Sequence, residues 1–149
     1  MASRGVPHHV MLLFPFVPVD DVDAEFLDRL ATIVRRGVGF DHSFVEARWF
    51  GHEVLWLFSD ADVRFRELID LVATEFSQYP PYSGEHADVV PHLTIADHGP
   101  LDAMRSAETT VNAHLPIRAT TMHVSLLAEQ HSGDWRRVER FALTASSRP

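Results

Sequence analysis

The sequence contains no cysteine among its 149 residues. Disulfide bonds, thiol nucleophiles and thiolate-ligated metal centres are therefore excluded. Basic residues are also few, since 13 Lys and Arg stand against 21 Asp and Glu and give a formal net charge of -8. Proteins that wrap a long nucleic acid use many basic contacts to phosphate, so this balance argues against such a partner. A small anion bound in a local pocket remains compatible with it.

The sequence also lacks an apolar run that could span a bilayer. Residues 10–17 are apolar, but the run is too short, is interrupted by Pro15 and has no basic flank followed by a small-residue cleavage site. We therefore expect a soluble cytoplasmic protein without a membrane partner. With 46% hydrophobic residues and no long low-complexity tract, residues 1–149 are expected to fold as a single domain with a substantial core.

Apolar periodicity divides the chain into alternating strands and helices. Prolines and glycines mark the ends of these segments, as at Pro15, Gly51 and Pro116. Strands are predicted at about residues 7–15, 44–50, 53–58, 91–99, 117–128 and 135–142, and helices at about 22–34, 62–77 and 100–111.

Each predicted helix carries an apolar stripe at helical spacing. Asp20 and Asp21 are candidates to cap the first helix, and Pro100 suits the first turn of the third. The inward stripes are Val22, Phe26, Leu30, Ile33 and Val34 in the first helix, Phe65, Leu68, Ile69, Val72 and Phe76 in the second, and Leu101, Met104, Ala107 and Val111 in the third.

The two halves of the chain repeat the order strand, helix, strand, strand, with the helix at 62–77 as connector. The repeat places His92 at the position of His9, an offset of 83 residues. The order predicts an α+β fold with two pseudo-symmetric lobes of antiparallel sheet, outer helices and a central cleft. The strands that carry the two histidines would then face each other across that cleft.

The segment PHLTIADHG at residues 91–99 alternates polar and apolar side chains. His92, Thr94 and Ala96 should share one face of this strand and Leu93 and Ile95 the other. A half-exposed strand with its polar side in water would explain this pattern too. If His9 joins His92 at one point, however, the two imidazoles could act as general acid and base on a phosphodiester, and Thr94 could donate to a phosphoryl oxygen.

Two segments resemble the motif-bearing segments of a known group. They are GVPHHVMLLFPF at 5–16 and YPPYSGEHADVVPHLTIA at 79–96, and they resemble the two HxTx segments of the two-histidine (2H) phosphoesterase superfamily, which includes the bacterial 2'-5' RNA ligase-like proteins. The resemblance implies a bilobal fold that acts without metal or cofactor on 2',3'-cyclic or related phosphodiesters. It also implies that His9 and His92 are catalytic and that Thr94 binds the phosphoryl group.

The first motif departs from that pattern, because Met11 stands where the family carries Thr or Ser. A thioether cannot donate a hydrogen bond. A charge-assisted hydrogen bond is worth about 1.5–3 kcal/mol, so its loss would lower rate or binding by about one to two decades unless another donor substitutes.

Other polar and aromatic residues have both a functional and a structural interpretation. Tyr82 could stack on a base or ribose, or only shape its loop. Arg48 could reach a phosphate in the cleft, or lie in solvent while Val45, Ala47 and Trp49 face the core. We expect His8 at the rim and the HxSx pair His123 and Ser125 in a structural strand, and we find no HExxH-type metal motif.

The sequence thus predicts a phosphoesterase acting on a cyclic nucleotide phosphate or on an RNA end that bears one. A protein of the same fold that binds a nucleotide or phosphate without turnover is the alternative, and a partner-binding domain is a third. Only eight residues precede His9, whereas similar proteins usually have another strand there. We therefore expect either a smaller first lobe in a monomer, or a homodimer in which a partner chain fills the edge.

Overall fold

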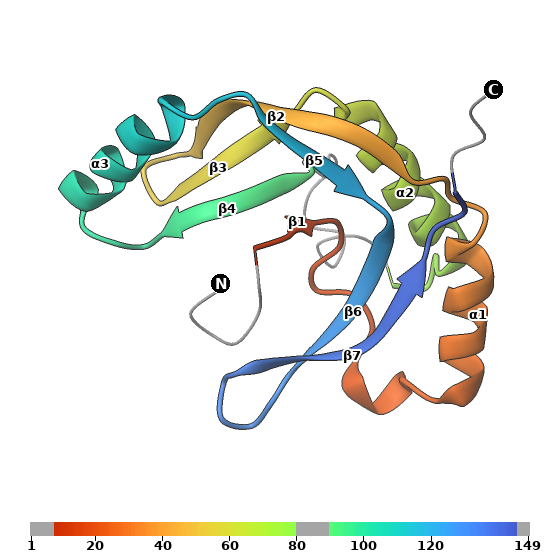
Figure 1. Ribbon diagram of the computed structural model, residues 1–149. Helices are drawn as coiled ribbons and strands as arrows, with labels where there is room; N and C mark the ends of the chain where they lie inside the picture. Colours follow the sequence, from red (N-terminus) through yellow and green to blue (C-terminus); the bar gives the residue numbers. More distant parts are fainter. Residues whose placement is uncertain (1–7, 80–89, 146–149) are drawn as a thin grey trace.

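A five-stranded sheet, a two-stranded hairpin and three helices make up the computed structural model, which describes residues 8–79 and 90–145 (Figure 1). The strands of the sheet run in the order β1-β4-β3-β2-β5, β6 pairs with β7, and every strand pairing is antiparallel. The elements are β1 (Val10–Met11), a 3-10 turn η2 (Val19–Asp21), α1 (Ala24–Val34), β2 (Phe40–Phe50), β3 (Val54–Ser59), α2 (Asp62–Glu75), β4 (His92–Asp97), α3 (Leu101–Asn112), β5 (Ile117–Thr121), β6 (His123–Glu129) and β7 (Trp135–Ala142).

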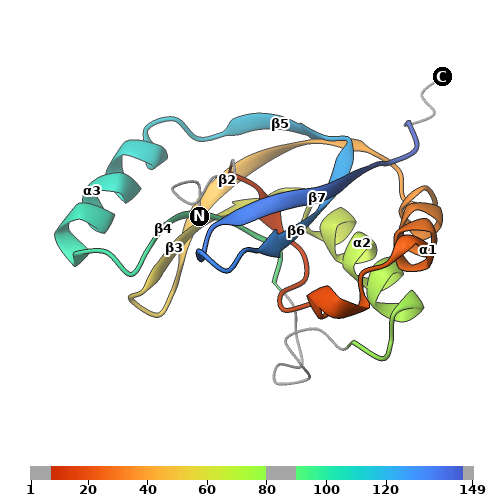
Figure 2. The ribbon, with the colours of Figure 1, turned by 90° about the horizontal axis from the view of Figure 1, so that it is seen from below.

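The helices lie outside the strands at two ends of the molecule. Helices α1 and α2 pack side by side at one end, where α1 also contacts β7, while α3 packs on β2 and β4 at the other (Figures 1 and 2). The main core joins α1 and α2 to β2 and β7 through Phe26, Leu30, Ile33, Val34, Phe40, Phe65, Leu68, Val72, Phe76, Phe141 and Leu143. Within the described ranges, no helix is both long and apolar enough to cross a membrane.

The α+β class with antiparallel sheets and outer helices is confirmed, as is the predicted order of elements. The two halves of the chain interleave, however, because β2 and β3 from the first half lie between β4 and β5 from the second. Strands β1 and β4 are consequently hydrogen-bonded neighbours and do not face each other from two sheets. Pairing in one sheet gives the backbone groups of both strands ladder partners.

Three predicted strands differ in extent from the observed ones, and one of them, β2, begins at Phe40, four residues before its predicted start. The first predicted strand is longer than the observed one, since β1 contains only Val10 and Met11 and pairs with β4 alone. The long strand predicted at 117–128 is divided at Met122, because β5 pairs with β2 while β6 turns away to pair with β7. Figure 1 shows the chain passing there from the sheet into the hairpin.

The helix stripes are largely as predicted, with two corrections. Asp23, and neither Asp20 nor Asp21, caps α1, because its Oδ1 accepts a hydrogen bond of 2.8 Å from the N–H of Phe26, which lies three residues on. In α3 only Met104 is buried, and Leu101 is 43% exposed. Helix α3 packs on β2 and β4 at one end of the sheet (Figure 1).

Candidate active site

The register of four strands brings the predicted site residues to one face of the sheet. Met11 pairs with His92, Trp56 with Thr94, and Arg48 with Trp56. Directly paired residues in antiparallel strands point to the same side, so these five side chains share one face, which we call the site face. The opposite, covered face carries Leu55 and Leu57 and packs against the helices.

His9 joins the site face from the residue before β1. The pairing of Val10 with Leu93 puts His9 opposite Thr94, and His8, His9, Met11 and Thr94 together line a small hollow. Its volume is about 10 Å³, which is about the space that one water molecule needs. The sequence-predicted residues His9, Thr94 and Met11 therefore meet, with His92 next to Met11.

His92 is held in a defined tautomer. Its Nδ1 is 2.8 Å from the carbonyl oxygen of Val90, and because a carbonyl can only accept, Nδ1 carries the proton of the neutral ring and Nε2 the lone pair. Burial lowers the pKa of His92 below 6.5, the Val90 bond raises it less, and the charge of His9 lowers it again. Burial therefore favours the neutral ring, which can accept a proton at Nε2. His92 also lies close enough to His9 for a charge on His9 to lower the pKa of His92.

Two aromatic rings pack against His92. Phe50 lies 5.2 Å from it and Trp56 6.2 Å, centroid to centroid, and both rings are nearly perpendicular to the imidazole. Phe50 and Trp56 stack on each other at 4.7 Å. Sequence reasoning missed both residues. The indole N–H of Trp56 is buried and has no hydrogen-bond partner among the described residues.

Arg48 lies on the site face but is not free in solvent. Its guanidinium carbon is 3.8 Å from the centroid of the Phe58 ring, and its Nη2 forms an ion pair of 3.1 Å with Glu46. The Phe58 ring provides an apolar surface against the guanidinium, and the exposed ion pair contributes little to the free energy of folding. Arg48 and Glu46 thus place an ion pair on the face that carries His92 and Thr94.

Two bulges change the predicted alternation of side chains. Between Phe44 and Glu46 the register shifts, so Val45 is 41% exposed and does not face the core as predicted. In β4 the shift between Thr94 and Ala96 pairs Ala96 with Leu55 on the covered face, away from His92. The extra residue in each strand is the physical reason for both corrections.

The other candidate residues lie outside this group. His8 is exposed at the rim of the hollow, as predicted. His123 and Ser125 are exposed on β6, where they pair with Ala142 and Arg140 of β7. Tyr82 falls outside the described residues.

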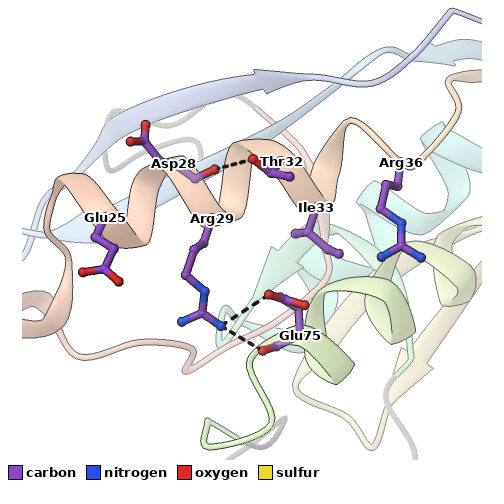
Figure 3. Close-up of a pocket in the computed structure, with 7 residues that line it drawn as sticks. All are labelled: Glu25, Asp28, Arg29, Thr32, Ile33, Arg36 and Glu75. Atoms are coloured by element: carbon purple, nitrogen blue, oxygen red, sulfur yellow. Dashed lines mark hydrogen bonds and ion pairs between the residues drawn. The ribbon is translucent and has the colours of Figure 1, made fainter.

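A larger hollow of about 560 Å³ lies on the outer helices (Figure 3). Arg29 of α1 reaches across it to the carboxylate of Glu75 at 3.4 Å. It is lined by Glu25, Asp28, Arg29, Thr32, Ile33, Arg36 and Glu75. No histidine lines this larger hollow, and it lies on the helices and not on the site face. Its size alone therefore does not make it the candidate active site.

Comparison with known proteins bears on the fold and the family. The family model described as the 2'-5' RNA ligase superfamily matches residues 2–133. The crystal structure of E. coli LigT complexed with 3'-AMP is 17% identical over 92% of this chain and 77% of that chain, with a TM-score of 0.54. The crystal structure of the apo form of E. coli LigT is 19% identical over 87% of this chain and 80% of that chain, with a TM-score of 0.47. No curated protein matches the sequence.

Proposed function

We propose that this chain, which belongs to the 2'-5' RNA ligase superfamily, hydrolyses 2',3'-cyclic phosphates of nucleotides or related phosphodiesters at RNA ends. The observation that carries the proposal is the meeting of His9 with Thr94 beside His92 on one face of adjacent strands. The similar fold of E. coli LigT, whose crystal structure holds 3'-AMP, supports a small nucleotide as ligand.

In the proposed reaction His92 is the general base. Its Nε2 takes a proton from a water molecule, and the water oxygen forms a bond to phosphorus. The bond from phosphorus to one ribose oxygen breaks, and His9 donates a proton to that oxygen. The assignment of the base to His92 follows from its lowered pKa and from the Val90 carbonyl that keeps the Nδ1 proton in place.

Thr94 has a different role, because its hydroxyl does not ionise near neutral pH and acts as a hydrogen-bond donor and acceptor. Its side chain lines the hollow beside His9 and can donate a hydrogen bond to a non-bridging phosphoryl oxygen. A fixed donor stabilises the charge that develops on this oxygen. His92 accepts the first proton and His9 donates the second, so the proposed mechanism uses neither a metal ion nor a cofactor.

The test compares His9→Ala and His92→Ala with the wild type on 2',3'-cyclic mononucleotides. Each substitution should lower kcat by about two to four orders of magnitude, the usual contribution of a positioned acid or base. His114→Ala is the matched control, since His114 is exposed after α3 and bonds only its own helix. If both site variants keep wild-type activity while folded, the catalytic assignment is wrong.

Met11 favours a second candidate function. A site that lacks one phosphate donor could bind a nucleotide without turning it over, as a non-catalytic nucleotide-binding protein would. Calorimetric titration with 3'-AMP, alongside the activity assay, separates the two. Binding of 3'-AMP that is lost in Thr94→Val, with no turnover of any cyclic nucleotide, would support the binding protein over the enzyme.

A further inference from the structure

The ring of Phe50 lies at the end of β2 with one face covered and the other uncovered by its aromatic neighbours. Trp56 stacks on it with an interplanar angle of 19° and a centroid distance of 4.7 Å. His92 is 5.2 Å from Phe50 and 6.2 Å from Trp56. Trp56 therefore stacks on one face of the Phe50 ring, and the imidazole of His92 packs against the ring in a nearly perpendicular orientation.

The second face of Phe50 is therefore covered by neither ring. The residue is 36% exposed, although Trp56 stacks on its ring and His92 packs against it. Aromatic side chains of this size are usually buried, because their contact with water is unfavourable. An exposed ring that is backed by a stacked tryptophan is instead a fixed, flat, apolar platform.

We propose that the nucleobase of the substrate stacks on this open face of Phe50. The inference rests on the proposed function and names the part of the substrate that gives it affinity. Every nucleobase has a flat π-face, and stacking on an aromatic side chain is a common source of affinity for nucleotides. Because the ring of Phe50 packs against His92, a single ribose can join a base on Phe50 to a phosphate at His92.

The platform also determines how selective the site is. The Phe50 ring has no hydrogen-bonding group, so it cannot read the edge of a base. All four bases should be accepted, with a modest preference for purines because their larger rings stack over more area. The donors and acceptors that would be needed for strong base discrimination are not supplied by this ring.

A structural role of Phe50 has to be separated from base binding. The ring contacts His92 and could act only by orienting the imidazole. Such a role would affect every substrate equally, including one without a base. A base platform affects only substrates that carry a base, and it acts mainly on KM.

The experiment measures kcat and KM of the wild type, Phe50→Leu and Phe50→Tyr on two substrates. These are 2',3'-cyclic AMP and methyl β-D-ribofuranoside 2,3-cyclic phosphate, which has the same ring phosphate without a base. Phe50→Leu keeps apolar bulk against His92 but removes the π-face. It should lower kcat/KM for the nucleotide by about 5- to 100-fold through KM. The base-free substrate should change by less than about twofold, and Phe50→Tyr should resemble the wild type on both.

Three outcomes would refute base stacking on Phe50 without refuting the proposed function. They are an equal loss on both substrates, no loss on either, and equal kcat/KM of the wild type for the two substrates. If the wild type turns over neither substrate, the proposed function fails. Titration with 3'-AMP then tests base stacking on Phe50 independently of turnover. Weaker 3'-AMP binding by Phe50→Leu than by Phe50→Tyr then supports it, and equal or absent binding by both refutes it.

Discussion

Replacing Met11 with threonine should increase activity, because it restores a hydroxyl where the phosphoryl group is expected. Met11 pairs with His92 and lines the hollow with His9 and Thr94. The hollow has a volume of about 10 Å³, about the space that one water molecule needs. The thioether of Met11 lines this hollow and offers no hydrogen-bond donor to a phosphoryl oxygen.

The size of the gain follows from the hydrogen bond that is restored. A hydrogen bond to a charged group contributes about 1.5–3 kcal/mol, which corresponds to about a 10- to 150-fold increase in kcat/KM. The substitution shortens a half-buried side chain, so the free energy of unfolding should fall, by about 1 kcal/mol. The protein should remain folded, because Met11 is outside the main core cluster.

Met11→Val is the matched control, since valine has nearly the shape of threonine without the hydroxyl. Hydrolysis of a 2',3'-cyclic mononucleotide is measured for both variants and the wild type, with thermal melts to confirm folding. The ratio of Met11→Thr to Met11→Val isolates the hydroxyl. If the two variants agree within about twofold, residue 11 does not contact the phosphoryl group in the transition state and the reasoning is refuted.

Three further predictions concern titration and capping. Because burial lowers the pKa of His92 below 6.5, the acidic limb of kcat/KM should lie below pH 6.5, and a limb at or above that value would contradict its role as base. Burial also lowers the pKa of His42 below 6.5. The contribution of His42 to the free energy of unfolding should therefore be complete above pH 6.5 and decrease as the pH falls below that value. Thermal melts of the wild type and His42→Gln check this, and an equal pH slope in both would contradict it. Asp23→Ala should cost about 0.5–2 kcal/mol by chemical unfolding, and a similar loss in Asp20→Ala would contradict the cap.

The sequence predicted the parts of the fold that depend on simple periodicity. The stripe Phe65, Leu68, Ile69 and Val72 is buried in α2, because a helix that lies on a core buries every third or fourth residue. His92 and Thr94 share a face for the equivalent reason in a strand, where side chains alternate. In both cases a local rule determines which side chains meet.

Long-range pairing could not be predicted in the same way. Nothing in the local pattern shows that β1 pairs with β4, since both histidine strands could equally have belonged to separate sheets. The buried pair His42 and Ser59, whose Nδ1 and Oγ are 2.9 Å apart, was also unexpected, because it depends on the register of β2 with β3. His42 also lies outside the strand predicted at residues 44–50, so no face could be assigned to it in advance.

The bulge in β2 determines which side chains of that strand reach the site face. Strict alternation from buried Phe44 would place Glu46, Arg48 and Phe50 on the covered face. Two charged side chains would then lie beneath helix α3, which packs on β2, and burying them without compensation would be costly. The extra residue Val45 moves all three to the site face. One insertion thus keeps charge out of the core and brings the Phe50 ring to His92, as expected of bulges beside functional sites.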